Sequence, residues 1–360
     1  KLESQYISHL DTQSNMLWLD KWRESLDIVC PFSRLESSPI SQSRFYLMQE
    51  SKLQETSLKG IDKLGSRLAL GCDNQTSALH AFTMFDHFYG SGGRIFDTAY
   101  IYNNGKGDKY LGDWINSRNV EDEILVLGKG AHTPECSPEF IRPQIIESLE
   151  RLQINKIDIF CLHRDNPDIP VAEFMDALNE VRSEGLIGSL GASNWELDRF
   201  SEARDYSAAN DKEAFSVLSN NFSLAEMVDP VWPGCVGTNN EYLNYLIDNK
   251  VMLFPWSSQA RGFFIKNKEI TSNEHFSNPS LEEEIRVWHD EKNLKRRKKC
   301  FEIAESRNVQ PIQVALAYVI QKSPLIFPLI GPRTVLETDS SIAATQLNLS
   351  KEEMNELFIN

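Results

Sequence analysis

The sequence lacks a run of about 18 apolar residues, the length that a membrane-spanning helix needs, and no basic-then-apolar segment near its start resembles a signal peptide. Positive charge is also in short supply, with 37 lysines and arginines against 52 aspartates and glutamates, a net charge of −15. This balance repels phosphate backbones and makes nucleic acid a poor partner. We therefore expect a cytoplasmic protein that binds neither membranes nor nucleic acid.

Cysteine is sparse and scattered. The six cysteines form no CxxC pair and have no histidine nearby at ligand spacing, so we expect reduced, buried thiols and no metal site. With 41% hydrophobic and 25% charged residues, the chain has the composition of a folded globular protein. A length of 360 residues suits one large α/β barrel or two ordinary domains.

Residues 1–59 differ from the rest in being rich in serine and glutamine and in having no strand-like runs. Behind Ser14, apolar residues recur at the three- to four-residue spacing of an amphipathic helix: Trp18, Trp22, Leu26, Val29. We interpret 1–59 as an N-terminal extension or linker and 60–360 as a separate domain that carries the barrel pattern. The chain begins with Lys1 rather than methionine, so whether it is a fragment of a longer protein stays open.

From about Lys63 onward, short apolar runs alternate with segments of helical period, which is typical of repeated βα units. Eight candidate strands can be counted: Arg67–Gly71, Arg94–Thr98, Ile124–Gly128, Ile157–Leu162, Ile187–Ala192, Val217–Ser219, Val251–Pro255, Leu325–Ile330. Eight is the number that closes a (β/α)₈ TIM barrel, whose active site forms at the C-terminal ends of the strands. The long connections 222–239 and 262–308 are expected to shape that site.

Three reactive side chains stand at successive strand ends. Asp97 ends the second candidate strand, Lys129 the third and His163 the fourth. Each alone is more often structural, as a helix cap, a surface lysine or a satisfied core histidine. Together at one rim they favour a functional site, because buried charge needs a partner and a Lys–Asp pair supplies it.

These residues resemble the aldo-keto reductase family of NAD(P)H-dependent (β/α)₈ barrels, from about Gly60 to the C-terminus. The family's Asp-Thr-Ala motif, the tyrosine five residues after the Asp, and the lysine and histidine of the next two strands have counterparts here: Asp97, Tyr102, Lys129, His163. The resemblance implies carbonyl reduction by direct hydride transfer. It also predicts that Tyr102 gives the proton and that Lys129, held by Asp97, brings the phenol pKa closer to the working range. His163 would orient the carbonyl.

The cofactor segments of the family also have counterparts, with departures. The implied contacts are Ser193, Asn194, Ser219, Trp256, Ser257, Gln259, Gly262, Gly331, Arg333, Thr334, Glu337 and Ser341. Trp256 takes the place of the usual tyrosine and Ser219 that of the usual glutamine. Arg333 favours NADP(H), because a basic side chain pairs with a 2′-phosphate. Glu337 would repel that phosphate, so NAD(H) stays possible.

Candidate substrate contacts are Tyr100, His132, Trp195 and Trp232. Tyr100 is a rival for the acid's role, but it stands three residues after Asp97 and does not match the family position. The apolar and aromatic loop 222–239, which carries Trp232, is expected to overhang the mouth. Such a wall suits stacking on a sugar ring or on a hydrophobic aldehyde equally well.

Other functions stay open at this level. Segments 221–227 and 256–264 resemble a bacterial-type branch of the family, whose members can follow a Gfo/Idh/MocA-type dinucleotide domain in carbohydrate metabolism, which would make 1–59 a linker from an upstream dinucleotide-binding domain. A cofactor-binding regulatory subunit with little turnover is a second hypothesis, and a barrel lyase using Lys129 as a Schiff-base amine is a third. The physiological substrate, the favoured direction and the oligomeric state are not determined by the sequence.

Overall fold

The computed structural model describes residues 52–265 and 281–358. In these residues one parallel sheet has the strand order β10-β3-β4-β5-β6-β7-β8-β9. Its strands are β3 (Ala69–Gly71), β4 (Ile95–Asp97), β5 (Leu125–Gly130), β6 (Ile157–Leu162), β7 (Ile187–Ala192), β8 (Val217–Leu218), β9 (Met252–Leu253) and β10 (Leu329–Ile330). All eight lie within or overlap the strands expected from the sequence. The amphipathic helix expected around Trp18 lies outside the described residues.

The sheet closes on itself between β9 and the segment that enters β10. The Leu253 amide donates to the Leu325 carbonyl at 2.9 Å, and the Phe327 amide donates back to the Leu253 carbonyl at 2.8 Å. Buried apolar side chains fill the interior: Ala69, Ile95, Leu125, Leu127, Ile159, Cys161, Val217, Met252, Phe254, Phe327, Leu329. The predicted (β/α)₈ barrel is thereby confirmed.

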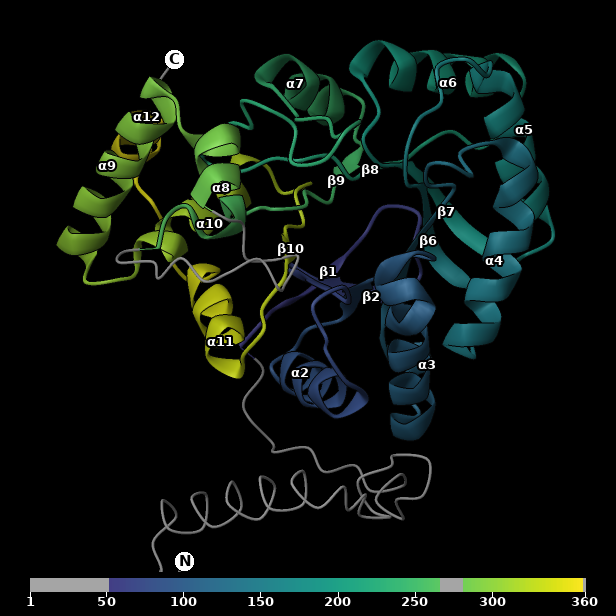
Figure 1. Ribbon diagram of the computed structural model, residues 1–360, viewed down its shortest axis with the longest axis horizontal. Coiled ribbons are helices and arrows are strands. Elements are labelled where there is room, and N and C mark those ends of the chain that lie inside the picture. Colours follow the sequence, from purple (N-terminus) through teal and green to yellow (C-terminus); the bar gives the residue numbers. More distant parts are fainter. Residues whose placement is uncertain (1–51, 266–280, 359–360) are drawn as a thin grey trace, which may run out of the picture. The chain divides into compact units, whose positions relative to one another are not determined.

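Helices surround the strands (Figure 1). The described ones are α2 (Ala78–Gly90), α3 (Lys106–Arg118), α4 (Pro138–Leu152), α5 (Val171–Ser183), α6 (Leu197–Ala209), α7 (Asn240–Asp248), α8 (Leu281–Trp288), α9 (Glu291–Arg307), α10 (Pro311–Lys322), α11 (Val335–Ala344) and α12 (Lys351–Leu357). Local sequence sets several starts: the side chains of Ser77 and Asn239 accept backbone N–H bonds at the first turns of α2 and α7.

A two-stranded antiparallel hairpin that the sequence analysis missed precedes the barrel. It consists of β1 (Glu55–Ser57) and β2 (Leu64–Ser66). Leu58, in its turn, is 4% exposed and belongs to the interior cluster of the barrel. Residues 52–59, which we assigned to the extension, therefore pack as part of the barrel. Three-residue strands have too short a pattern to be recognised by alternation.

The expected long connection after the seventh strand contains α8 and α9. The basic run 292–299 lies in α9 and is only partly exposed, because Arg296 is 3% exposed and pairs with Glu226 at 3.0 Å. The Glu226 amide also donates to the Asn293 side-chain oxygen at 2.8 Å, and the Glu226 carbonyl accepts from the Asn293 side-chain nitrogen at 2.7 Å. Helix α9 thus holds the loop 222–239 in place beside the barrel mouth.

Candidate active site

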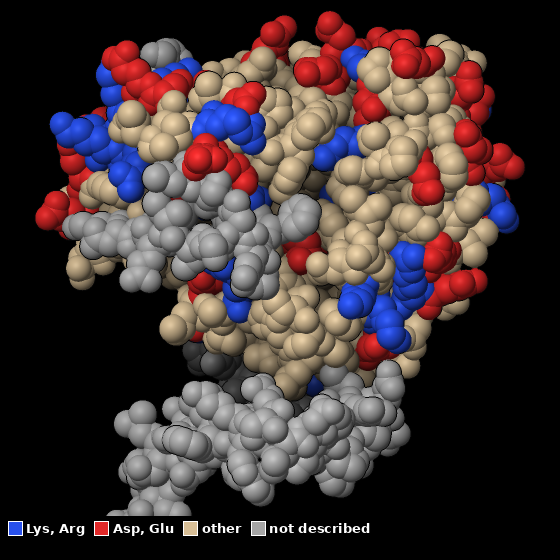
Figure 2. All heavy atoms as spheres, in the orientation of Figure 1, with Lys and Arg blue, Asp and Glu red and all other residues tan. Residues whose placement is uncertain are grey.

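One cavity of about 1620 Å³ opens at the C-terminal ends of the strands and contains all four predicted catalytic side chains in its wall. Asp97 is the last residue of β4, Lys129 lies in β5, and His163 directly follows β6. Tyr102 begins the short helix η4 (Tyr102–Gly105) after β4. On the face shown in Figure 2, most acidic side chains lie toward the periphery, away from the central hollow.

Lys129 joins Asp97 to Tyr102. Its ammonium forms a buried ion pair with the Asp97 carboxylate, and both residues are 3% exposed. The same Nζ donates to the Tyr102 hydroxyl at 3.3 Å and lies 5.2 Å from the centre of that ring. The parallel register explains the arrangement, because Asp97 lies opposite Leu127, two residues from Lys129 and on the same face.

Burial and charge shift the pKa values of this group. Burial raises the pKa of Asp97 to about 6, although Lys129 acts in the opposite direction. Burial acts to lower the pKa of Lys129, but Asp97 and Tyr102 outweigh it and hold that pKa above its ordinary value. Loss of solvation raises the pKa of Tyr102 more than Lys129 lowers it. The expected net lowering of the phenol pKa is therefore absent, and Tyr102 keeps its proton at neutral pH.

His163 is 7% exposed and faces Tyr102, with the ring centres 5.7 Å apart. Burial, together with the positive charges of Lys129 and Arg164 and with His132, holds its pKa well below the ordinary value. The imidazole is therefore neutral around pH 7 and carries one N–H. Its Nδ1 is buried and has no hydrogen-bond partner in the described part of the chain.

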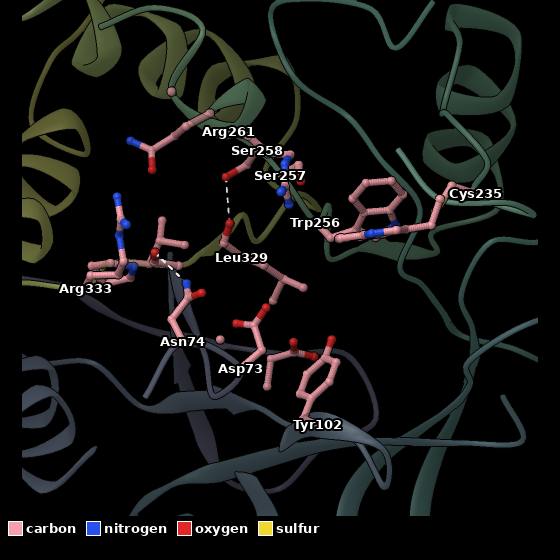
Figure 3. Close-up of a pocket in the computed structure, with 18 of the residues that line it drawn as sticks. Asp73, Asn74, Tyr102, Cys235, Trp256, Ser257, Ser258, Arg261, Leu329 and Arg333 are labelled. Atoms are coloured by element: carbon pink, nitrogen blue, oxygen red, sulfur yellow. Dashed lines mark hydrogen bonds between the residues drawn. The ribbon is translucent and has the colours of Figure 1, made fainter. Parts of the chain in front are cut away.

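Most predicted cofactor contacts line the same cavity: Ser193, Asn194, Trp256, Ser257, Gln259, Gly262, Gly331, Arg333, Glu337, Ser341. Figure 3 shows Arg333 and Cys235 on opposite sides of the pocket, with Tyr102 and Asp73 below and Trp256 between. The Ser193 hydroxyl donates to the Ser219 carbonyl at 2.6 Å. The cavity thus extends from Arg333 on one side to Cys235 on the other.

The segment after β9 has an unusual backbone. Four of its residues have positive φ: Ser257 (48°), Ala260 (49°), Arg261 (50°) and Gly262 (89°). Left-handed conformations are uncommon outside glycine, and here they form tight turns in which the Ala260 and Gly262 amides donate to the Ser257 and Gln259 carbonyls at 2.8 and 3.2 Å. The Ser258 hydroxyl ties the segment to β10 by donating to the Leu329 carbonyl at 2.7 Å, the bond drawn in Figure 3.

Two predicted cofactor contacts lie outside the cavity wall. Thr334 caps α11 instead, its hydroxyl accepting from the Glu337 amide at 3.2 Å. Ser219 is fully buried and contributes its carbonyl to Ser193, not its side chain to the cavity. Glu337 does line the cavity, and its carboxylate accepts from the Arg333 amide at 2.6 Å. Part of its negative charge is thereby satisfied within the protein.

Two of the four predicted substrate contacts line the cavity and two do not. His132 and Trp232 line the cavity, where His132 packs edge-on against His163 at 4.9 Å and Trp232 lies 6.2 Å from Trp256. Tyr100 and Trp195 do not line it, which corrects our expectation. The Tyr100 hydroxyl donates to Glu147 on α4 at 2.8 Å. Trp195 is completely buried, and its indole donates to the Arg164 carbonyl at 3.2 Å.

Several cavity residues were missed by the sequence analysis: Asp73, Asn74, Asn103, Arg164, Arg261. Asp73 and Asn74 come directly after the strand that ends at Gly71, so their position at a strand end was a usable signal. Asn74 donates to the Gly331 carbonyl at 2.8 Å. A Cβ at Gly331 would lie only 2.7 Å from the Asn74 side-chain nitrogen, so a larger residue there would displace the Asn74 side chain.

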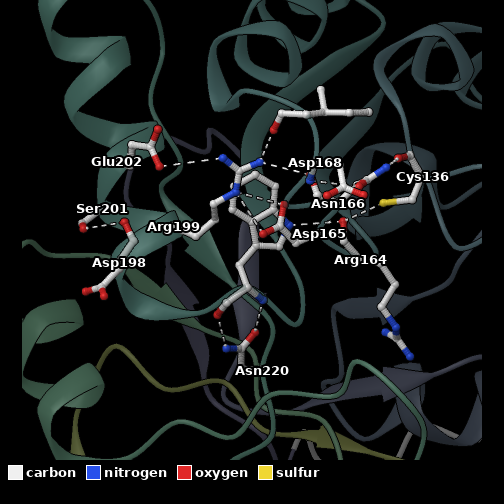
Figure 4. Close-up of polar contacts among 12 residues, drawn as sticks. Cys136, Arg164, Asp165, Asn166, Asp168, Asp198, Arg199, Ser201, Glu202 and Asn220 are labelled. Carbon is white, nitrogen blue, oxygen red and sulfur yellow. Dashed lines mark hydrogen bonds and ion pairs between the residues drawn. The ribbon is translucent and has the colours of Figure 1, made fainter.

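Behind the cavity wall, a polar network fixes the loop after β6 (Figure 4). Arg199 from α6 pairs with Asp165 at 3.1 Å and donates to the Asn166 carbonyl at 3.2 Å. The Asn220 side chain accepts from the Asn194 amide at 2.6 Å and donates to the Trp195 carbonyl at 2.8 Å. This network positions the backbone that carries His163 and Asn194.

A family model described as "Aldo/keto reductase family" matches residues 64–358 of the chain. The chain belongs to the aldo/keto reductase family. It is an enzyme of oxidoreductase type, from a family that reduces carbonyl groups with nicotinamide cofactors. The family resemblance noted from Asp97, Tyr102, Lys129 and His163 is thereby confirmed.

Relatives of this aldo/keto reductase include fungal enzymes. It is 28% identical to a norsolorinic acid reductase of Aspergillus flavus over 306 residues, covering 79% of this chain and 71% of the relative. It is 25% identical to an NADP(+) aryl-alcohol dehydrogenase of Phanerodontia chrysosporium, covering 78% and 75%. A solved thermostable aldo-keto reductase, Tm1743, shares the fold, with a TM-score of 0.65, 20% identity and coverage of 84% and 98%.

Two kinds of feature are absent from residues 52–265 and 281–358. No helix in these ranges is long and apolar enough to cross a membrane. No group of three or more His, Cys, Asp or Glu side chains there could hold a metal ion. The five described cysteines are free and buried, as expected, and Cys30 lies outside the described residues.

Proposed function

We propose that this aldo/keto reductase reduces the carbonyl group of an aldehyde, ketone or keto-sugar to an alcohol with NADPH, and that Tyr102 gives the proton. One observation carries the proposal: the Lys129 ammonium contacts both Asp97 and the Tyr102 hydroxyl in the wall of a cavity that extends to Arg333. The roles of the individual residues below are part of the proposal.

The cavity fits a nicotinamide dinucleotide. Its volume of about 1620 Å³ exceeds the range of about 300–1,000 Å³ that is usual for small-ligand pockets. The cavity is lined by part of the segment after β9: Ser257, Gln259, Arg261, Gly262. The Trp256 indole N–H is buried without a hydrogen-bond partner in the described residues. An unsatisfied buried donor in the cavity wall is consistent with a site that binds a ligand.

In this site, Trp256 would stack on the nicotinamide, Ser193 and Asn194 would contact its carboxamide, and Arg333 would pair with the 2′-phosphate. Ser257, Gln259 and Gly262 would hold the pyrophosphate, and Gly331, Glu337 and Ser341 would face the adenosine. When bound, the cofactor supplies the hydride that carbonyl reduction requires. These contacts would orient the cofactor so that its reactive face meets the carbonyl beside Tyr102.

The side chains of the protein transfer the proton, stabilise the charge that results and orient the carbonyl. Tyr102 is protonated at neutral pH and can give its proton to the carbonyl oxygen as negative charge develops there. The Lys129 ammonium at 3.3 Å stabilises the phenolate that is left, and Asp97 keeps that ammonium charged and in place. The neutral His163 donates its one N–H to the same oxygen and orients the carbonyl.

Cofactor choice can be tested at Arg333 and Glu337. We expect Arg333→Ala to weaken NADPH binding about 10- to 100-fold, with NADH changed by less than about 3-fold, because only NADPH carries a 2′-phosphate. Glu337→Gln should tighten NADPH binding by removing a like charge. Quenching of tryptophan fluorescence, with Trp256 as a nearby reporter, measures both affinities. An equal loss of both cofactors in Arg333→Ala would contradict this assignment.

The pH dependence of the reaction follows from Asp97. Its pKa of about 6 means that the carboxylate is lost as pH falls through 6, and with it the partner that holds Lys129. We expect kcat/KM to fall below about pH 6 and to show no alkaline decline up to about pH 9, because Tyr102 keeps its proton. Turnover measured across this range checks the prediction, and a profile that stays flat down to pH 5 would disprove it.

The structure disfavours the Schiff-base alternative. An amine must lose its proton to attack a carbonyl, whereas the buried ion pair with Asp97 holds the pKa of Lys129 above its ordinary value.

The regulatory-subunit alternative differs from our proposal in predicting little or no turnover. A panel of aromatic aldehydes and keto-sugars with NADPH tests this, and the names of the relatives make aromatic aldehydes the first choice. Cofactor binding without consumption for any carbonyl would favour a regulatory subunit.

A further inference from the structure

Arg164 is a buried cation in the cavity wall that has no carboxylate partner within the described part of the chain. It is 8% exposed and follows His163 directly in the chain. In residues 52–265 and 281–358, its guanidinium makes two hydrogen bonds: to the His163 carbonyl at 3.0 Å and to the Cys235 sulfur at 3.6 Å. A guanidinium has five N–H donors, so five less two leaves three for another group.

The carboxylates of the next residue in the chain and of the catalytic group are paired with other cations. Asp165, the next residue, pairs with Arg199, and Asp97 pairs with Lys129. Figure 4 shows the Arg164 side chain turned away from the Asp165–Arg199 network. A buried charge without a counter-ion is costly, and proteins keep such a charge where a ligand completes the pair. Arg164 therefore points to an anion that the described part of the chain does not provide.

The position of Arg164 assigns that anion to the substrate. Its guanidinium contacts Cys235, which lies on the opposite side of the pocket from Arg333 (Figure 3). It also bonds to the backbone of His163, whose ring faces Tyr102. A group bound here would thus lie beside the reacting carbonyl and far from the 2′-phosphate end.

We propose that Arg164 binds the carboxylate of a substrate that carries its reactive carbonyl at Tyr102 and His163, so that the enzyme favours aldehyde or keto acids. This deepens the proposed function and rests on it. A carboxylate matches the planar fork of one guanidinium and its single charge. His132 adds no second cation, because burial lowers its pKa more than its hydrogen bond to the Thr133 carbonyl at 2.8 Å raises it.

Matched substrate pairs test the proposal. Succinic semialdehyde is compared with butanal, and 4-carboxybenzaldehyde with 4-methylbenzaldehyde, so that only the negative charge differs appreciably within each pair. We expect the wild type to prefer the acid of at least one pair in kcat/KM. Arg164→Met should lower that acid-to-neutral ratio about 100-fold, mainly through KM, since charged hydrogen bonds to the substrate are lost. Arg164→Lys should restore part of the ratio by restoring the charge.

Two controls distinguish carboxylate binding by Arg164 from a general effect of removing a positive charge and from an effect on turnover alone. Arg142→Met removes the same charge from an exposed ion pair with Glu184 outside the cavity and should leave the ratio unchanged. A fluorescence titration of the NADPH complex with 4-carboxybenzaldehyde reads binding without turnover, and Arg164→Met should weaken it. The proposal is overturned if the wild type shows no acid preference, if Arg164→Met lowers both members of a pair equally, or if carboxylate binding is unaltered. If the protein binds the carboxylate in an Arg164-dependent way but turns over no substrate, only the proposed function is refuted.

Discussion

Replacing Tyr102 by phenylalanine is expected to lower kcat about 1,000-fold while leaving the dissociation constant for NADPH within about 3-fold, because a positioned general acid contributes about 10² to 10⁴ in rate. The hydroxyl is the only group removed, and it lies 3.3 Å from the Lys129 ammonium. A proton donor serves the transition state, so its loss affects turnover more than ground-state binding. Steady-state kinetics and a fluorescence titration of the same preparation measure the two effects.

Tyr100→Phe is the matched control. Tyr100 is a neighbouring tyrosine whose hydroxyl donates to Glu147 on α4, away from the cavity. We expect this variant to keep kcat within about 3-fold of the wild type, since it removes no group near the carbonyl. Equal losses in the two variants, or unaltered turnover in Tyr102→Phe, would show that the acid is not Tyr102.

Lys129→Met should damage both activity and stability. It removes the charge that stabilises the Tyr102 phenolate, so we expect kcat to fall at least about 100-fold. It also leaves the Asp97 carboxylate buried without its cation, and loss of one partner of a buried pair costs about 3–5 kcal/mol of unfolding free energy. Thermal and denaturant unfolding measure the second effect and turnover the first.

The double variant Asp97→Asn, Lys129→Met distinguishes the two effects. With the uncompensated carboxylate gone, the double variant should be more stable than Lys129→Met alone, since no buried charge remains. Its activity should stay as low as that of the single variant, because the phenolate still has no cation beside it. Recovery of turnover together with stability would mean that Lys129 acts only through the fold.

The parts that the sequence predicted well share a common basis. Strand positions, the barrel and the family followed from periodicity over long stretches and from residue types at strand ends. Asp97, Lys129 and His163 come together in the structure because parallel strands present their C-terminal ends at one rim. Their catalytic roles stay predictions, since nothing in the geometry alone measures proton transfer.

What the sequence could not provide was the direction of individual side chains. Tyr100 and Tyr102 are two residues apart, yet the first bonds to α4 and the second faces the cavity, because the turn between β4 and η4 rotates the chain. Trp195 is an aromatic residue next to a cavity residue but is enclosed by the core. The net upward shift of the Tyr102 pKa likewise depends on desolvation, which a sequence does not reveal.

Transfer of deuterium tests the central claim most directly. The protein would be mixed with NADPH carrying deuterium at the transferable position of the nicotinamide and with 4-carboxybenzaldehyde or 4-methylbenzaldehyde, and the alcohol formed would be analysed by mass spectrometry. Our account predicts that each alcohol molecule formed by the wild type carries one deuterium on the former carbonyl carbon, and that one alcohol forms for each NADPH consumed. In Tyr102→Phe the same labelled alcohol should form at a greatly reduced rate. Alcohol without deuterium, or bound cofactor that is never oxidised by any carbonyl, would contradict it.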